Sequence, residues 1–82
     1  RQAIADYGEA IRLNPKSATA YSNRANAYLA LGDSDNAIAD FGAVLRLDPK
    51  QTAAWIGRAN ASRDRKDYDR AITDLDASIK QK

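Results

Sequence analysis

The sequence predicts an all-α protein, an α-solenoid of antiparallel helix hairpins with five helices and a 34-residue repeat. Offsetting the 82 residues by 34 pairs 48 positions, of which 20 are identical. Each repeating unit holds two helical stretches, and the turns between them leave no room for a sheet. One hairpin cannot bury both of its apolar faces, whereas stacked hairpins share a continuous core. The fixed period therefore favours a solenoid over a plain helical bundle.

Composition excludes several classes of protein before any motif is considered. The chain is 44% hydrophobic with a mean hydropathy of −0.63, which is too apolar for a disordered tail. It contains no His and no Cys, so the commonest metal ligands, the default general base and disulfide bonds are absent. No apolar run approaches the ~20 residues that span a bilayer, and no signal-peptide pattern is present. We expect no cofactor, no metal and no membrane partner; the compartment is unknown, with the cytoplasm favoured.

The first three helices can be justified in chain order. A helix is predicted near 1–13, and a second spans 17–31, where Ser17 caps its start and Gly32 takes the left-handed conformation that closes its end. The third spans 35–47 and stops before Pro49, because the residue preceding a proline is pushed out of the helical region. The apolar residues of this third helix share one face: Ala37, Ile38, Phe41, Val44 and Leu45.

The last two helices are predicted near 52–65 and 69–81, and the first of them departs from the repeat at its end. Three residues that close the preceding unit are replaced: Tyr28, Leu31 and Gly32 become Ser62, Arg65 and Lys66. A lysine in the left-handed turn costs about 1 kcal/mol relative to glycine. We therefore expect the C-terminal end to be the softer one.

The repeating unit resembles the tetratricopeptide repeat, whose pattern has an aromatic, small residues, a second aromatic, an alanine, a third aromatic and a proline. The residues that carry the resemblance are Tyr21, Ala25, Tyr28, Ala37, Phe41 and Pro49, then Trp55, Ala59, Ala71 and Leu75, and before them Ala3, Tyr7 and Pro15. The resemblance covers one domain, 1–82, divided into a half repeat over 1–17, a full repeat over 18–51 and a nearly full repeat over 52–82.

The resemblance implies that the first helix of each hairpin lines a concave groove that binds a peptide or a helix. The predicted groove residues are Thr19, Ser22, Asn23, Asn26, Ala53, Ile56, Gly57, Asn60 and Arg63, with Lys16 and Lys50 at the rim. Asn26 and Asn60 recur one repeat apart, and their amides suit the backbone of an extended peptide. The alternative is that these asparagines are merely solvated.

Some members of this family hold a partner's C-terminal carboxylates with a lysine and arginine clamp. Ser22 and Ile56 stand where a clamp lysine would lie, and Ala53 is also uncharged. We therefore do not predict that clamp, and we expect Ile56 and Gly57 to form a partly apolar floor.

Arginines at two equivalent positions, Arg24 and Arg58, fall within the apolar sector of their helices. A cation placed there must be paired or must extend to water. The repeating aspartates supply partners, so we predict structural ion pairs of Arg24 with Asp6 or Asp40, and of Arg58 with Asp40 or Asp74.

No catalytic or metal-binding motif is present in the sequence. The aspartates at 33, 35, 67 and 69 lie in the inter-helix turns, where they cap the following helix, and nothing completes a calcium loop. No nucleotide loop or nucleophile elbow appears. We therefore expect no enzyme.

The chain ends predict exposed apolar faces, because solenoids need capping helices. The candidates are Ile4, Tyr7 and Ile11 at one end, and Ile72, Leu75 and Ile79 at the other. We expect a fragment of a longer array that forms a homo-oligomer through these terminal helices.

The leading prediction is a non-catalytic protein-interaction module with a protein or peptide partner, and the alternative is a self-associating scaffold. A third, RNA binding, is disfavoured by interspersed acidic residues: 13 basic and 11 acidic residues give a net charge of +2.

Overall fold

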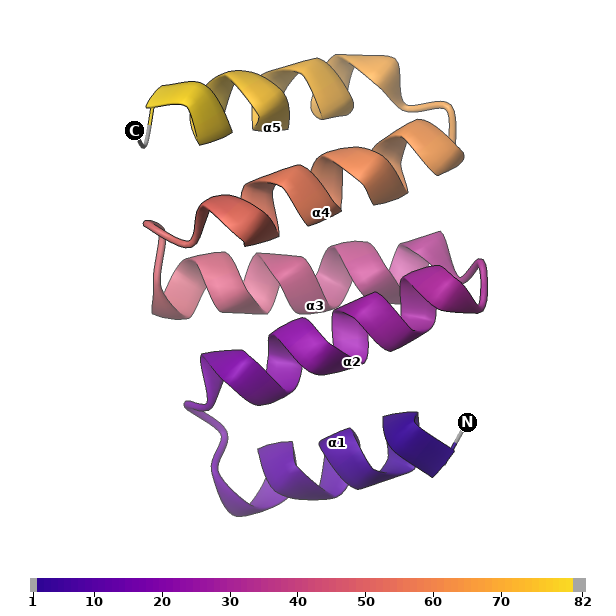
Figure 1. The fold of residues 1–82 in the computed structure, drawn as a ribbon, viewed down its shortest axis with the longest axis vertical. Coiled ribbons are helices and arrows are strands. Elements are labelled where there is room, and N and C mark those ends of the chain that lie inside the picture. The colour runs from indigo at the N-terminus through magenta and orange to yellow at the C-terminus, as the bar shows by residue number, and fades with distance from the viewer. Residues whose placement is uncertain (1, 81–82) are drawn as a thin grey trace.

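The computed structural model describes residues 2–80 of the chain, apart from the side chain of Gln2. These residues form five helices and no strand. In chain order they are α1 (Gln2–Leu13), α2 (Ala18–Ala30), α3 (Ser34–Leu47), α4 (Thr52–Asp64) and α5 (Tyr68–Lys80). Successive helices run antiparallel and stack from one end of the molecule to the other (Figure 1). The predicted fold class is confirmed; the predicted helix limits at positions 1 and 81 lie outside the described residues.

Helix limits are set by the capping residues that the sequence supplies. Ser17 accepts a hydrogen bond at 3.2 Å from the backbone N–H of Ala20, and Asp33 accepts one at 3.3 Å from the N–H of Asn36. Such bonds satisfy amide groups that the first turn of a helix leaves without partners. Gly32 has a φ of 78°, as a left-handed helix ending requires, and Lys66 takes the same role with a φ of 66°.

The core lies around α3, because α3 is the helix packed between α2 and α4. Its residues Phe41, Val44 and Leu45 are buried, and α2 and α4 oppose them with small side chains such as Ala25 and Ala54. Alanine at these positions lets the helix axes approach closely while favouring the helix itself. Only a thin core results: the stack measures 33 × 25 × 13 Å.

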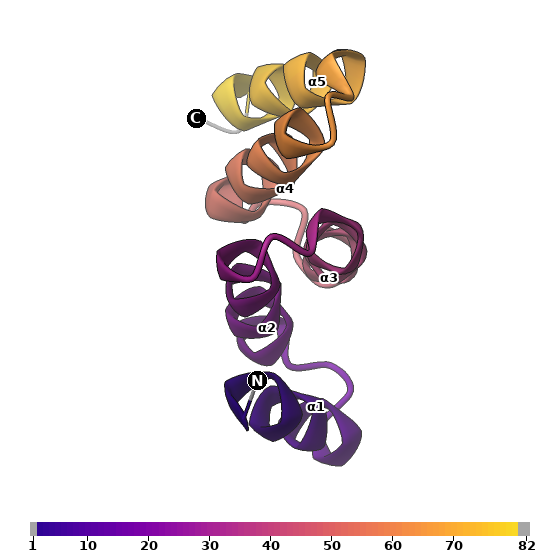
Figure 2. The same ribbon diagram turned by 90° about the vertical axis from the view of Figure 1, so that its right-hand side faces the viewer.

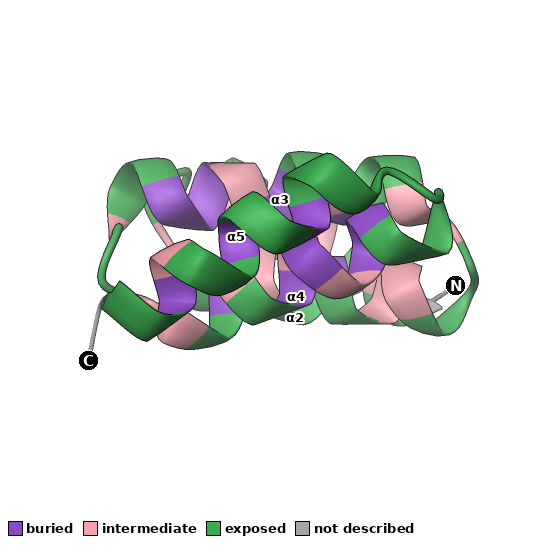
Figure 3. Ribbon diagram, turned by 90° about the horizontal axis from the view of Figure 1, so that it is seen from above, coloured by how far each residue is buried: buried purple, intermediate pink, exposed green. Residues whose placement is uncertain are grey.

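The terminal helices are covered on one side only. No residue of α1 between positions 3 and 13 is buried, and the outer face of α5 shows Ile72, Leu75 and Ile79 at 59%, 43% and 69% exposure. Figure 3 looks onto this outer face of α5, which is largely exposed. Within residues 2–80, no helix combines the length and apolar character needed to cross a bilayer.

Candidate functional site

The helices predicted to bind a partner, α2 and α4, lie side by side and contact each other directly. Viewed edge-on, both lie on one side of the stack while α3 lies on the other (Figure 2). Most of the predicted groove residues on these helices are exposed: Thr19, Asn23, Asn26, Ala53, Ile56 and Arg63, with Ser22 and Asn60 half-buried. We call these eight residues the α2–α4 surface.

Two asparagines occupy equivalent places on the α2–α4 surface. Asn26 on α2 is exposed and Asn60 on α4 is half-buried. Within residues 2–80, no group forms a hydrogen bond with either side-chain amide. Each amide thus keeps two donors and an acceptor for solvent or for a ligand. Ile56, one helical turn before Asn60, adds an apolar side chain that is 41% exposed.

Gly57 does not belong to the groove, and the sequence-based prediction for this residue is wrong. Gly57 is buried, and a Cβ atom at this position would lie 2.4 Å from Cζ of Phe41. The residue therefore lets α4 pack directly on the Phe41 ring of α3. The apolar part of the α2–α4 surface consists of Ile56 and Ala53 alone.

The two rim lysines lie in equivalent turns at one end of the surface. Lys16 and Lys50 are exposed, and each donates its backbone N–H to the side chain two residues earlier. The acceptors are Asn14 at 3.3 Å and Asp48 at 3.2 Å. These turns fix the backbone from which both lysine side chains extend into solvent.

Each arginine of the apolar sector pairs with the aspartate of its own hairpin. Arg24 donates two hydrogen bonds to Asp40, from Nε at 2.7 Å and Nη2 at 2.8 Å. Arg58 binds Asp74 in the same way, at 3.0 and 2.9 Å. The hydrogen bond to Asp40 raises the pKa of Arg24 above its ordinary value, although partial burial opposes the rise. Both pairs are the bidentate fork that arginine forms with carboxylates.

Aromatic rings complete the surroundings of both arginines. The guanidinium carbon of Arg24 lies 5.8 Å from the ring centre of Tyr21 and 5.9 Å from that of Tyr28. Arg58 lies 5.2 Å from the ring of Trp55. Cation–π contacts at this range add to the attraction of the carboxylates. The rings of Tyr21, Tyr28 and Trp55 therefore contact arginines of their own helices, within the hairpins.

Asp6 departs from the predicted set of ion pairs. It is exposed, and no ion pair among residues 3–80 includes it. The physical reason is that each arginine turns to the helix that follows it, so Arg24 takes Asp40. The third nitrogen of Arg24, Nη1, faces α1, where it would lie 3.6 Å from a Cβ atom built on Gly8.

Two of the four acidic residues predicted to cap helices do so, whereas Asp35 and Asp69 lie within the first turns of α3 and α5, where their side chains accept no capping hydrogen bond from a described residue. Asp33 binds the N–H of Asn36, and Asp67 accepts from the N–H of Arg70 at 3.3 Å. The ion pair that Arg65, at the end of α4, forms at 2.9 Å with Asp35 was not predicted. Among the described residues, no cluster of acidic side chains is arranged to hold a metal ion.

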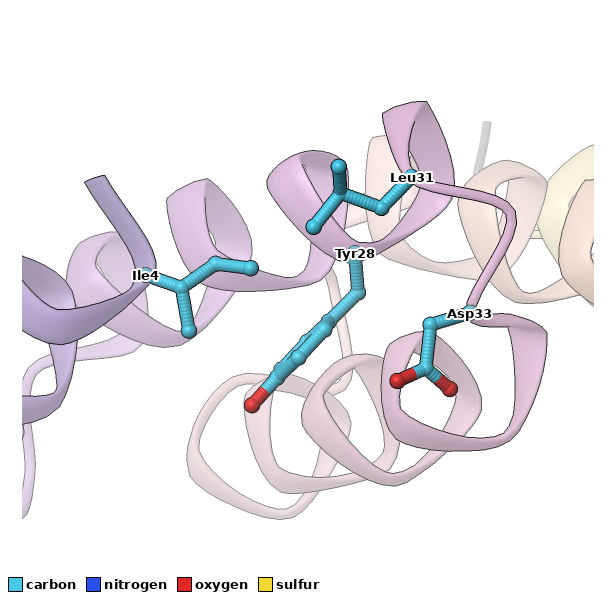
Figure 4. A pocket seen from close by; sticks show the side chains of 4 residues that line it. All are labelled: Ile4, Tyr28, Leu31 and Asp33. Atoms are coloured by element: carbon cyan, nitrogen blue, oxygen red, sulfur yellow. The ribbon is translucent and has the colours of Figure 1, made fainter. Parts of the chain in front are cut away.

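Two cavities lined by described residues lie away from the α2–α4 surface. The larger has a volume of about 460 Å³ and is lined by Ile4, Tyr28, Leu31 and Asp33 (Figure 4). The smaller, about 180 Å³, is lined by Pro15, Tyr21, Ala43, Arg46 and Leu47. Sequence reasoning missed both, because their walls come from three elements whose relative placement no local pattern specifies.

Two family profiles match the chain. A family profile described as "Tetratricopeptide repeat" matches residues 22–82, and a second, described as "TPR repeat", matches residues 1–32. No curated protein sequence is significantly similar to the chain.

Solved structures similar to the chain include two that share about a third of its sequence. The TPR2B domain of yeast Sti1, in a complex with pHsp70, is 36% identical with a TM-score of 0.91. The TPR domain of Arabidopsis OM64 is 32% identical with a TM-score of 0.92. MamA, at 23% identity and a TM-score of 0.92, shares the fold.

The chain spans only part of each of these structures. The alignments cover 95%, 96% and 95% of this chain but 62%, 65% and 46% of the Sti1, OM64 and MamA chains.

Proposed function

Since the chain belongs to the tetratricopeptide repeat family, we propose that it is a non-catalytic protein-interaction module that holds an extended peptide on the α2–α4 surface. Proteins of this fold are interaction modules, and a similar domain of yeast Sti1 is in a complex with pHsp70.

The observation that carries the proposal is the pair of unengaged amides at Asn26 and Asn60. They recur 34 residues apart on two adjacent helices. The α2–α4 surface therefore carries two carboxamide groups at equivalent positions. A peptide backbone offers alternating N–H and C=O groups, and a carboxamide side chain can satisfy both. The two asparagine side chains are therefore suited to bind an extended peptide, whose backbone N–H and C=O groups have no hydrogen-bond partners within the peptide.

The rest of the surface indicates what kind of peptide fits. Ile56 and Ala53 provide an apolar patch for one aliphatic side chain, because burying such a side chain is the main source of affinity. Arg63 at the far end of α4, and Lys16 and Lys50 at the near ends, are exposed cations. We infer a peptide with an aliphatic residue near its centre and acidic residues towards its ends.

The position of the aromatic rings on α2 and α4 does not favour RNA binding. Single-stranded RNA is held by bases stacked on aromatic rings. The rings of the two inner helices, Tyr21, Tyr28 and Trp55, lie against the paired arginines.

A peptide array, followed by titration of the best binder, tests the proposal. Asn26→Ala combined with Asn60→Ala removes both amides and is expected to weaken binding by about tenfold, since each neutral hydrogen bond contributes about 0.5–1.5 kcal/mol. Asn36→Ala, at an exposed asparagine of α3, is the matched control and should bind like the parent chain. Unchanged affinity of the double variant would contradict the proposal.

The exposed apolar face of α5 favours a second candidate, self-association with α5 of a second copy. Ile72, Leu75 and Ile79 fall on one helical face at i, i+3 and i+7, with 43% to 69% of each exposed. Two of their counterparts one repeat earlier, Phe41 and Leu45, are buried in the core around α3. Two copies of α5 packed antiparallel would bury this face twice.

Light scattering over a range of concentrations tests the second candidate. A dimer that is lost in Ile79→Ser and kept in Ile56→Ser would support it, because only the first change lies on α5. A monomer at every concentration would contradict it.

A further inference from the structure

We propose that the smaller of the two cavities, which lies between α2 and α3, binds the side-chain carboxylate of a glutamate from a protein partner. The cavity lies away from the α2–α4 surface, so the proposal does not depend on peptide binding there. Its walls are formed by Pro15, Tyr21, Ala43, Arg46 and Leu47.

The arginine of the preceding repeat shows how a cation at this position is paired within the chain. Arg12, in the last turn of α1, donates a hydrogen bond from Nε to Glu9 at 3.1 Å and a second one from Nη2. Glu9 lies three residues earlier, and side chains at this spacing are neighbours on a helix surface. Arg12 therefore has its carboxylate partner on its own helix.

The arginine that lines the cavity lacks this partner, because the glutamate is replaced by alanine. Arg46 corresponds to Arg12 one repeat later, and Ala43 corresponds to Glu9. No ion pair among residues 3–80 includes Arg46. Since Ala43 and Arg46 both line the cavity, the cavity lies where a glutamate side chain at the alanine position would begin.

The charges on α3 and α4 favour an anion beside Arg46. Nη1 of Arg46 would lie 3.9 Å from a Cβ atom built on Gly42, and Nη1 of Arg58 would lie 3.8 Å from the same atom. Two guanidinium groups thus approach one point on α3. Arg58 is neutralised by Asp74, whereas Arg46 contributes an uncompensated positive charge. A carboxylate would form charge-assisted hydrogen bonds with this guanidinium.

Two further cations lie in the turns that flank the cavity. Lys16 follows the cavity wall at Pro15, and Lys50 lies in the turn after α3; both lysines are exposed. The acidic residue of the second turn, Asp48, accepts the backbone N–H of Lys50 at 3.2 Å. Positive charges around a cavity attract acidic ligands and speed their association.

The size and the walls of the cavity indicate a glutamate side chain as the ligand. The cavity volume of about 180 Å³ is several times the ~30 Å³ that one water molecule occupies in the liquid. Ala43 and Leu47 provide apolar wall for methylene groups, and Arg46 provides donors for a carboxylate. A glutamate presents these groups in that order, as Glu9 does towards Arg12 within the chain.

NMR titration of the isotopically labelled chain with a blocked glutamate tests the proposal. The probe is glutamate with its amino group acetylated and its α-carboxyl group converted to the methylamide, so only the side-chain carboxylate is charged. At constant ionic strength, we expect a saturable shift of the Arg46 Nε–H signal at millimolar probe. The equally blocked glutamine should bind about tenfold more weakly, because its hydrogen bonds are not charge-assisted.

Three variants test whether Arg46 is the group that binds the carboxylate. Arg46→Gln should weaken binding of the blocked glutamate by about tenfold. Arg12→Gln is the matched control and should bind like the parent chain, because this arginine already has a carboxylate partner. Ala43→Glu restores the missing glutamate, so it should abolish probe binding by filling the cavity from within the chain; circular dichroism checks that this variant is folded.

Several results would overturn the proposal. These are the absence of a saturable shift at Arg46, shifts of equal size at all arginines, or unchanged binding by Arg46→Gln or by folded Ala43→Glu. N-acetylglycine, whose only carboxylate is the α-carboxylate, tests the source of the ligand group. If it binds as tightly as the blocked glutamate, the assignment to a glutamate side chain is wrong.

Discussion

The helices α3 and α5 hold the same place in successive repeats, yet α3 forms the core and α5 forms an edge. Phe41 and Leu45 of α3 are 2% and 8% exposed, whereas Leu75 and Ile79, one repeat later, are 43% and 69% exposed. Residue type does not explain this difference in exposure, since all four side chains are large and apolar. Burial in this fold follows from whether a neighbouring hairpin is stacked on the helix.

The hairpin contacts, unlike the stacking contacts, are the same in both repeats. Asp40 and Asp74 are both buried, and each is held by the arginine of its own hairpin. The comparison teaches that each hairpin combines apolar packing with an internal ion pair, whereas the outer apolar face of its second helix is buried only where the next hairpin is stacked on it. The following predictions test that division.

The largest effect is expected from breaking an arginine–aspartate pair. Arg58→Met leaves the buried carboxylate of Asp74 without a counterion, and removing one partner of a buried pair costs about 3–5 kcal/mol. Arg24→Met should cost less, because its partner Asp40 and its own side chain, 23% exposed, keep more contact with water. Urea unfolding followed by circular dichroism measures both free energies of unfolding.

The double variant Arg58→Met with Asp74→Leu serves as the control for this experiment. It removes both charges, so most of the lost stability should return. If the double variant were as unstable as the single one, the uncompensated carboxylate would not be the cause.

Stacking between hairpins is tested by two glycines in helix interiors. Gly57→Ala places a methyl group against the Phe41 ring and is expected to cost about 1–3 kcal/mol through overpacking. Gly42→Ala meets only arginine nitrogens at 3.8 and 3.9 Å, so it should gain about 0.5–1 kcal/mol from helix propensity. Thermal and urea unfolding compare the two; equal effects would mean that α4 does not pack on Phe41 as described.

A smaller effect distinguishes the two hairpin turns. Lys66→Gly should stabilise the chain by about 1 kcal/mol, because lysine there occupies a left-handed conformation with a φ of 66°. Gly32→Ala, at a φ of 78° in the equivalent turn, should destabilise it by a similar amount. A stabilising Gly32→Ala would show that the left-handed turn is not maintained in solution.

The smallest effect concerns pH and α1, where the ion pair is fully exposed. The hydrogen bond from Arg12 lowers the pKa of Glu9, so the folded state binds this proton more weakly than the unfolded state. The resulting stabilisation is present above the ordinary glutamate pKa and is lost as pH falls through the lower, folded value. Glu9→Gln should remove this part of the acid dependence of the unfolding temperature, and an unchanged pH profile would exclude it.

Much of the fold could be predicted because its determinants are local and repeat. The period, the cap at Ser17 and the left-handed ending at Gly32 each follow from residue type at one position. The arginines at 24 and 58 could be recognised because a cation within an apolar sector demands a partner. These signals require no knowledge of how the helices cross.

The remaining features depend on the packing of helices and could not be read from one helix at a time. A helical wheel allowed Arg24 either Asp6 or Asp40, and only the placement of α3 decides between them. Gly57 lies beside Ile56 in sequence, yet one faces the Phe41 ring and the other faces solvent. The corresponding residue on α2, Asn23, is exposed, so the period itself did not reveal the difference.

Mapping of a bound peptide by NMR tests most directly the claim that α2 and α4 present the binding surface. Amide chemical shifts of the isotopically labelled chain are followed while the best peptide from the array is added. We predict that the largest changes fall at Ile56, Asn26 and Asn60. Changes concentrated on α5, at Ile72, Leu75 and Ile79, with none on α2 and α4, would contradict the account.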